Sequence, residues 1–242
     1  MCRSRRRPYG SGTVGRMSEN GTPLASRRTL LLAAGSAGIA ALASACTRRE
    51  ATPAAAPNPS GGPTPHCVLA TEMGAGPYYS GPGRLRSDIT EGQSGVPLRL
   101  ELTVVGVKAG CAPLAGAAVD VWQADAQGVY SSGRATHLRG SQVTDAAGRC
   151  VIRTIVPGWY AGVAPHIHFK VRPDARSETT SVFYLPEEIL RQVYARDPYS
   201  RRKAPKDPNA RDDRYRDKGP AMTLALAPDG TGYRAAYTVG LA

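Results

Sequence analysis

The sequence predicts an all-β fold, a single β-sandwich of seven or more short strands with long loops and one short helix. Three observations support this prediction. Apolar and polar residues alternate along residues 98–104, as on a strand with one buried face. Turn-forming residues separate such segments, for example at 145–148 and 228–230. Hydrophobic residues make up 41% of the chain, which is enough for a packed core.

The expected elements follow one another from residue 98 to the C-terminus. Strands are expected at 98–104, 117–123, 150–156, 166–172, 179–185, 222–227 and 232–239. A hairpin turn at Pro228-Asp229-Gly230 would join the last two strands. One short helix is expected after Pro186, with Glu187 and Glu188 in its first turn and an apolar face behind them.

Residues 1–46 are predicted to be an upstream segment and a twin-arginine signal peptide. The pair Arg27-Arg28 precedes a small-residue apolar stretch, Ala33 to Ala45, which is too short and Gly/Ala-rich for a stable membrane span. Two outcomes stay open at its end. Lipidation of Cys46 would give an anchored lipoprotein, whereas cleavage after the Ala-Ser-Ala sequence would release a secreted, extracytoplasmic protein.

A Pro/Ala-rich linker is expected over residues 47–66, followed by one folded domain over 67–242. The domain contains three cysteines, Cys67, Cys111 and Cys150. In an oxidising compartment they would form one disulfide and leave one thiol. The sequence does not identify which two of them pair.

The net charge of +12 does not indicate a nucleic-acid-binding protein. Half of this charge lies in residues 1–45, within the predicted upstream segment and signal. The densest basic stretch of the remainder, Arg201 to Lys218, is interleaved with aspartates, which is typical of a solvated loop. We therefore expect no nucleic-acid partner.

His166 and His168 are the sharpest candidates for a metal site. Residues i and i+2 of a strand point to the same face, so both imidazoles would project together and Ile167 would face the other way. The same spacing also suits two incidental histidines, or a zinc or copper site. Tyr160 and Tyr130 precede the pair in sequence, and taken alone each would be read as a packing or rim residue.

In order and spacing, these residues and their neighbours resemble the intradiol ring-cleavage dioxygenases, especially the exported members of that family. The likeness covers residues 67–240 and implies an immunoglobulin-like or prealbumin-like sandwich. The matching segments are Gly76–Tyr79, Pro113–Ala117, Val119–Trp122, Gly128–Ser131, Leu138–Asp145, Pro157–Tyr160 and Pro165–His168.

The resemblance implies one ferric, non-heme iron per chain, held by Tyr130, Tyr160, His166 and His168. Ferric iron favours phenolate oxygens, and coordination lowers the pKa of a phenol below its usual value of about 10. The implied reaction opens a catechol-like ring between its two hydroxylated carbons with O2. In it Tyr160 leaves the metal and takes a substrate proton, while Tyr130 stays bound. A homo-oligomer is a further expectation.

Two positions depart from the family pattern. Val163 stands where an arginine would stabilise negative charge on the ring, and Ser181 stands where a glutamine is common. Arg139, Arg153 or Gln142 could substitute from elsewhere in the fold. Two other hypotheses therefore stay open: a noncatalytic exported sandwich that binds iron or catecholic ligands, and a module for carbohydrate or cell-wall attachment.

Overall fold

The computed structural model describes residues 67–160, 162–204 and 208–242. The expected signal peptide, the lipidation position Cys46 and the linker over 47–66 lie outside these residues. Among the helices that are described, none combines the length and apolar character needed to cross a bilayer.

Nine strands and two α-helices are described, so the predicted all-β sandwich is confirmed. The strands are β1 Pro97–Gly106, β2 Ala112–Pro113, β3 Ala118–Gln123, β4 Arg139–Val143, β5 Arg149–Ile155, β6 His166–Arg172, β7 Thr179–Tyr184, β8 Ala227–Asp229 and β9 Gly232–Leu241. The helices are α1 Glu187–Tyr194 and α2 Asp213–Lys218, with 3-10 turns η1 Tyr199–Arg201, η2 Asn209–Arg211 and η3 Pro220–Met222.

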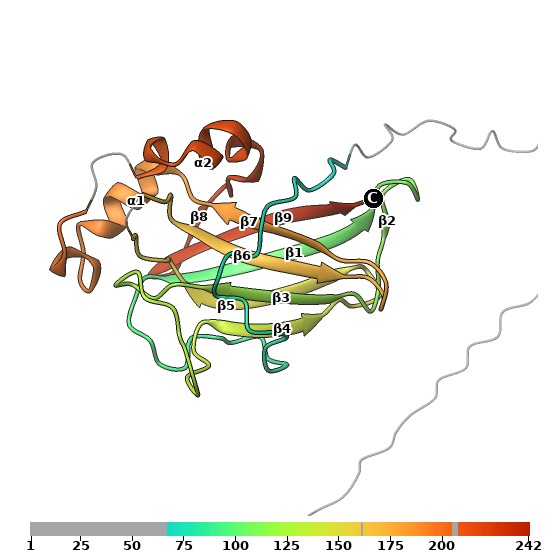
Figure 1. Cartoon of the computed structure of the whole chain (residues 1–242), viewed down its shortest axis with the longest axis horizontal. Helices are drawn as coiled ribbons and strands as arrows, with labels where there is room; N and C mark the ends of the chain where they lie inside the picture. Colours follow the sequence, from blue (N-terminus) through green and yellow to red (C-terminus); the bar gives the residue numbers. More distant parts are fainter. Residues whose placement is uncertain (1–66, 161, 205–207) are drawn as a thin grey trace, which may run out of the picture. The chain divides into compact units, whose positions relative to one another are not determined.

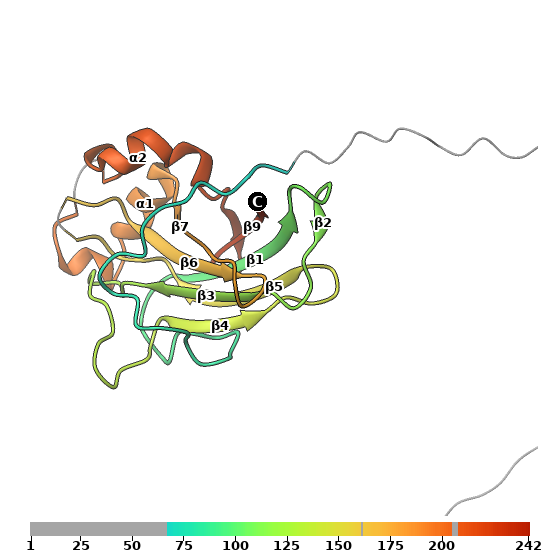
Figure 2. The same cartoon turned by 45° about the vertical axis from the view of Figure 1, so that its right-hand side comes forward.

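The strands form two sheets that face each other (Figures 1 and 2). One sheet has the order β2-β1-β9-β8, with β5 also paired to β1, and the other has the order β4-β3-β6-β7. Strands β1 and β9 pair in parallel, and the remaining pairs are antiparallel. In both views α1 and α2 lie at the end of the sandwich where β6 begins.

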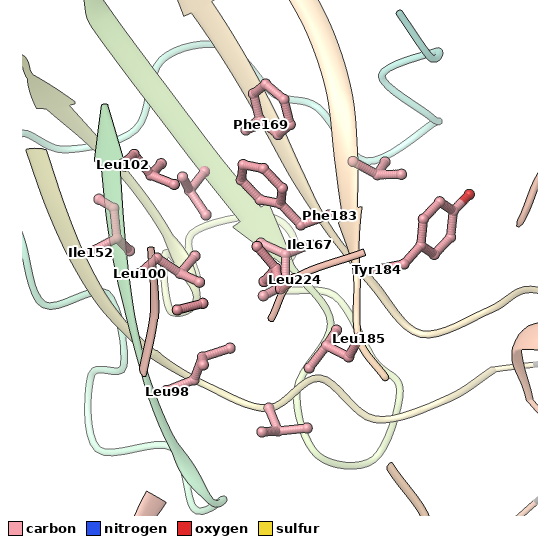
Figure 3. Close-up of a cluster of buried hydrophobic side chains, with 14 of the residues drawn as sticks. Leu98, Leu100, Leu102, Ile152, Ile167, Phe169, Phe183, Tyr184, Leu185 and Leu224 are labelled. Atoms are coloured by element: carbon pink, nitrogen blue, oxygen red, sulfur yellow. The ribbon is translucent and has the colours of Figure 1, made fainter. Parts of the chain in front are cut away.

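The core lies between the sheets and follows the period-two pattern (Figure 3). Leu98, Leu100 and Leu102 of β1 are buried opposite Phe169 of β6 and Phe183 of β7. The two phenylalanine rings stack with centroids 4.3 Å apart. Burying each of these side chains stabilises the fold by about 1.5–3 kcal/mol relative to leaving it exposed. The packing between the two sheets is therefore the main force that holds them together.

Strand β6 has two different faces. Ile167 and Phe169 point into the core, and by alternation His166 and His168 point to the outer face of the four-stranded sheet. Loops preceding β1 cover this outer face, with backbone hydrogen bonds from Met73 to Thr180 and from Arg86 to Ser141. The metal site expected from the sequence therefore lies between a sheet and its covering loops, outside the main core.

Two expectations about the elements were wrong. The strand expected at 222–227 is a 3-10 turn followed by an extended stretch, and β8 begins only at Ala227. Leu224 is buried, which produced the strand-like pattern, but the stretch makes only a single isolated bridge to β7, between Thr223 and Tyr184, with the N–H of Leu224 bonded to the carbonyl of Tyr184. The stretch from Arg201 to Lys218, expected to be a solvated loop, contains η2 and α2 and buries Asp212.

The expectation of one disulfide and one remaining thiol among the three cysteines is confirmed. Cys67 and Cys111 form a disulfide with their Cα atoms 5.8 Å apart. Cys150 remains a thiol, buried in β5. The disulfide ties the start of the described domain to the turn that follows β1.

Candidate metal centre

The four residues singled out in the sequence meet at one point on the outer face of the four-stranded sheet. The Nε2 atom of His166 lies 3.0 Å from Nε2 of His168. The same His166 atom lies 3.2 Å from the hydroxyl oxygen of Tyr160 and 3.4 Å from that of Tyr130. Two phenol oxygens and two imidazole nitrogens thus converge, although they come from three separate segments of the chain.

His166 is held by its other ring nitrogen. Its Nδ1 lies 2.7 Å from the carbonyl oxygen of Ala164, which can only accept, so Nδ1 carries the proton. In the neutral ring, Nε2 then presents a lone pair toward His168 and the two phenols. A hydrogen bond of this kind is the usual way in which a metal-binding histidine is oriented.

His168 is held differently, by stacking. Its ring lies parallel to the indole of Trp122, with centroids 4.8 Å apart and planes 2° apart. Its Nδ1 is buried and finds no hydrogen-bond partner within the described part of the chain. The backbone of Gly76 also lies close to this ring, since a Cβ built there would lie 3.4 Å from its Cε1 and Nε2 atoms.

Tyr130 is positioned by a tight loop after β3. The carboxylate of Asp125 accepts hydrogen bonds from the N–H groups of Gln127 and Val129, which fixes the turn. Gly128 adopts φ +78°, and a Cβ there would lie 2.1 Å from the carbonyl oxygen of Trp159. The absence of a side chain lets this loop touch the segment that carries Tyr160.

Tyr160 follows a Pro-Gly break after β5 and is the most accessible of the four residues. Its ring meets those of Tyr130 and His166 edge-on, with both centroid distances 5.9 Å. A backbone bridge joins Tyr160 to Val163 and turns the chain back into β6. Tyr130, by contrast, is buried and stacked against Tyr78 at 4.2 Å.

Burial determines the charge of all four residues. It lowers the pKa of His166 to about 4 and that of His168 to about 2, so both imidazoles are neutral near pH 7. Burial also raises the pKa of both Tyr130 and Tyr160 above the ordinary value. Without a cation the phenols therefore stay protonated, and a bound cation would favour their anionic form.

This donor set fits a metal ion. The converging imidazole nitrogens and phenol oxygens are Lewis-basic atoms that can coordinate one cation together. Zinc sites use Cys, His and carboxylate ligands, so two phenols favour ferric iron over zinc. Across the described residues, no group of three or more His, Cys, Asp or Glu gathers that could form another such site.

The structure also locates the positions that depart from the family pattern. Ser181 pairs with Phe169 and is fully buried on the core side of β7, so it does not face the site. Val182, which pairs with His168, occupies the site-facing position on that strand. Val163 is half-buried and carries no charge.

Of the three residues considered as substitutes for the missing arginine and glutamine, Arg139 is the one whose charge acts on the site. Its positive charge acts on the pKa of both Tyr130 and His168. Its guanidinium donates to the hydroxyl and carbonyl oxygens of Ser131 and to the carbonyl oxygen of Tyr78, which fixes it in place. Arg153 lies on β5 in the other sheet, and Gln142 lies on the edge strand β4.

One charged pair near the site has no signal in the sequence. Arg214 lies on α2 and acts electrostatically on Tyr160, His166 and His168. It bonds the buried carboxylate of Asp212. The pair comes from the mixed-charge stretch, where nothing distinguishes these two residues from their solvated neighbours.

Comparison with known proteins agrees with this geometry. A family model described as "Dioxygenase" matches residues 75–195, half of the chain. A chlorocatechol 1,2-dioxygenase of Pseudomonas sp. (strain P51) is 34% identical over 96 residues, which cover 31% of this chain and 38% of that protein. Its Pseudomonas putida counterpart is 31% identical over 94 residues, 30% of this chain and 36% of that protein. The chain thus matches well under two thirds of the length of these relatives.

Solved structures extend the match over most of the domain. An intradiol ring-cleavage dioxygenase from Tetranychus urticae superposes with a TM-score of 0.68 at 26% identity, covering 72% of this chain and 94% of that one. The dioxygenase domain of a carbohydrate-binding fusion protein from Streptomyces sp. SirexAA-E gives a TM-score of 0.57 at 28% identity, covering 72% and 98%. With the family match and the converging residues, these likenesses lead to one conclusion: the chain belongs to the intradiol ring-cleavage dioxygenase family.

Proposed function

We propose that this protein is a non-heme Fe(III) intradiol dioxygenase that opens a catechol-like ring between its two hydroxylated carbons with O2. One observation carries the proposal. In a chain of the intradiol family, two phenol oxygens and an imidazole nitrogen lie 3.0 to 3.4 Å from Nε2 of His166.

The iron would be held by Tyr130, Tyr160, His166 and His168, with one ion per chain. When bound, ferric iron would supply Lewis acidity toward both oxygens of a catecholate. The neutral imidazoles add no charge of their own, so the two phenolates would offset most of the charge of the metal.

The two tyrosines are suited to different tasks. Tyr130 is buried and stacked on Tyr78, which favours a fixed ligand. Tyr160 is more accessible and lies at the end of a loop, so its hydroxyl oxygen can move and accept a proton from the incoming substrate. The positive charge of Arg139, which lowers the pKa of both Tyr130 and His168, would also favour an anionic substrate in the site.

The visible absorption spectrum of the iron-loaded protein tests the proposal. A ferric phenolate gives a broad charge-transfer band, which should weaken in Tyr130→Phe and in Tyr160→Phe. Tyr233→Phe is the matched control and should keep the band, because Tyr233 is a buried tyrosine of β9, in the sheet that does not carry the two histidines. Addition of a catechol should shift the band and start O2 consumption. A colourless iron-loaded protein would rule out the tyrosine–iron site.

A noncatalytic iron or catechol binder is the second candidate. It is favoured by the uncharged Val163 in the position of the missing arginine. Such a protein would show the charge-transfer band and its shift with catechol, but it would consume no O2. Oxygen uptake therefore separates the two candidates, and family membership argues against a plain attachment module.

We also propose export by the twin-arginine route. The disulfide between Cys67 and Cys111 supports this proposal, since disulfides persist mainly in oxidising compartments. Replacement of Arg27 and Arg28 by lysine should retain the protein in the cytoplasm of a producing bacterium. Cell fractionation would measure this, and mass determination of the exported form would show whether Cys46 carries a lipid.

A further inference from the structure

Asp212, immediately before α2, connects the C-terminal segment to the metal centre. Its side chain is only 5% exposed, and its Oδ2 accepts the backbone N–H of Ala164 at 3.1 Å. Ala164 in turn accepts the hydrogen bond from Nδ1 of His166. We propose that Asp212 is a positioning residue that orients the imidazole of His166 through the backbone of Ala164. The proposal concerns the site of the proposed function and rests on it for its consequence for iron.

Pro165 makes this connection stiff. A residue before proline is restricted to extended conformations, so Ala164 has little freedom in ψ. When Asp212 holds the N–H of Ala164, the carbonyl of this extended residue is therefore limited to a narrow range of directions. That carbonyl is the acceptor that places the proton of His166 on Nδ1 and aims the Nε2 lone pair at the other donors.

Asp212 is itself held from two sides. The side chain of Arg214 donates to both of its oxygens, at 3.2 and 3.3 Å, and the N–H of Arg214 adds an N-cap bond at 3.0 Å. Burial raises the pKa of Asp212, but these bonds and that of Ala164 outweigh it and keep the carboxylate ionised. The preceding turn η2 is anchored because Asn209 donates to the carbonyl of Leu185.

A second contact runs from the same helix to the same histidine. The ring of Tyr215 meets that of Tyr184 edge-on at 5.0 Å, and Tyr184 meets His166 at 6.2 Å. Two paths from α2 therefore end on His166. His168 stacks on Trp122, and its Nδ1 finds no hydrogen-bond partner among the described residues, so no hydrogen-bonded path links it to this segment.

The variants separate two functions of Asp212: its hydrogen bond with Ala164 and its N-cap bond with Arg214. Asp212→Ser keeps an N-cap oxygen for α2, but its side chain is too short to reach Ala164. Asp213→Ser changes the neighbouring aspartate, which pairs with Arg216 on the exposed face of the same helix, and is the matched control.

The first measurement reads His166 in the metal-free protein, so it does not depend on iron or activity. Nitrogen-15 NMR should show a single Nδ1-protonated tautomer of His166 in the natural protein and in Asp213→Ser. Asp212→Ser should show both tautomers in exchange. An unchanged tautomer in Asp212→Ser would overturn the proposal, and so would an equal disturbance in Asp213→Ser, because the bond to Ala164 would then not be the cause.

The second measurement is the affinity for ferric iron, from competition with a chelator. Partners behind a metal ligand typically change affinity by 10- to 100-fold, so Asp212→Ser should bind iron about tenfold more weakly than the control. Equal affinity in Asp212→Ser and Asp213→Ser would count against the proposal. If the natural protein gives no charge-transfer band while the tautomer result holds, the proposed iron enzyme fails and the positioning role of Asp212 stands.

Discussion

Gly128 is the residue at which the loop of Tyr130 touches the segment of Tyr160. We expect Gly128→Ala to destabilise the protein by about 2–4 kcal/mol, because it combines a strained positive φ with a side chain that overlaps the Trp159 carbonyl. Gly133→Ala is the control, since its φ is also positive but no atom lies within 4 Å of the new Cβ. Its cost should be about 1 kcal/mol. Urea unfolding measures both, and equal costs would show that the close contact does not matter.

The two buried histidines make the stability of the metal-free protein depend on pH. Burial lowers the pKa of both below the unfolded value, so the unfolded state binds protons more readily as pH falls below about 6.5. The free energy of unfolding should therefore decrease between about pH 6.5 and pH 4, by about 1.4 kcal/mol per pH unit for each histidine at most.

Urea titrations of the metal-free protein at several pH values test this dependence. Replacing His166 and His168 together by asparagine should flatten the curve in that interval. A slope that survives the double replacement would assign the pH dependence to other groups.

At the scale of elements, a polar cluster joins the covering loop to the four-stranded sheet. The buried carboxylate of Asp120 on β3 accepts hydrogen bonds from Tyr79 of the loop at 2.7 Å and from Ser141 of β4 at 2.6 Å. It also forms an ion pair with Arg172 of β6. Burial and the neighbouring Asp120 raise the pKa of Tyr79 to about 12, so its hydroxyl remains a donor.

Removing the cation should loosen the whole cluster. We expect Arg172→Met to cost about 3 kcal/mol, because it leaves Asp120 charged and buried without its partner. Arg99→Met, which breaks a pair with Glu101 on the exposed surface of β1, should change stability by less than about 1 kcal/mol. Denaturant unfolding compares the two, and similar small changes would mean that water already compensates Asp120.

The elements also show which features the sequence could predict. Strand β6 was predicted with its two faces, because alternation records directly which side chains are buried. Strand β4 was missed because its residues, Arg-Gly-Ser-Gln-Val, are mostly polar or small, and one side of it is covered by a loop and not by the core. The contact of Asp212 could not be predicted either, because its partner Ala164 lies 48 residues away in the sequence.

At the scale of the molecule, the site is assembled from segments that sequence order cannot bring together. The resemblance supplied the four residues Tyr130, Tyr160, His166 and His168, and the structure places them within contact of one another. It could not supply the surroundings peculiar to this chain. The charge of Arg214, the stack of Trp122 on His168 and the inward position of Ser181 all depend on packing between distant elements.

The disulfide also connects segments that are distant in the sequence, but it does so covalently. It joins Cys67 to Cys111 across 44 residues, so it restricts the unfolded chain over the covering loops and β1. Replacing both cysteines by serine should lower the free energy of unfolding by about 2–4 kcal/mol. Treatment of the natural protein with a reductant should lower it by the same amount and should not affect the serine variant. Cys150→Ala is the control, because its thiol is unpaired: this variant should respond to reductant as the natural protein does. If reduction left the unfolding curve of the natural protein unchanged, the loops over the candidate metal site would be held by packing alone, and the disulfide would serve only to tether the start of the domain.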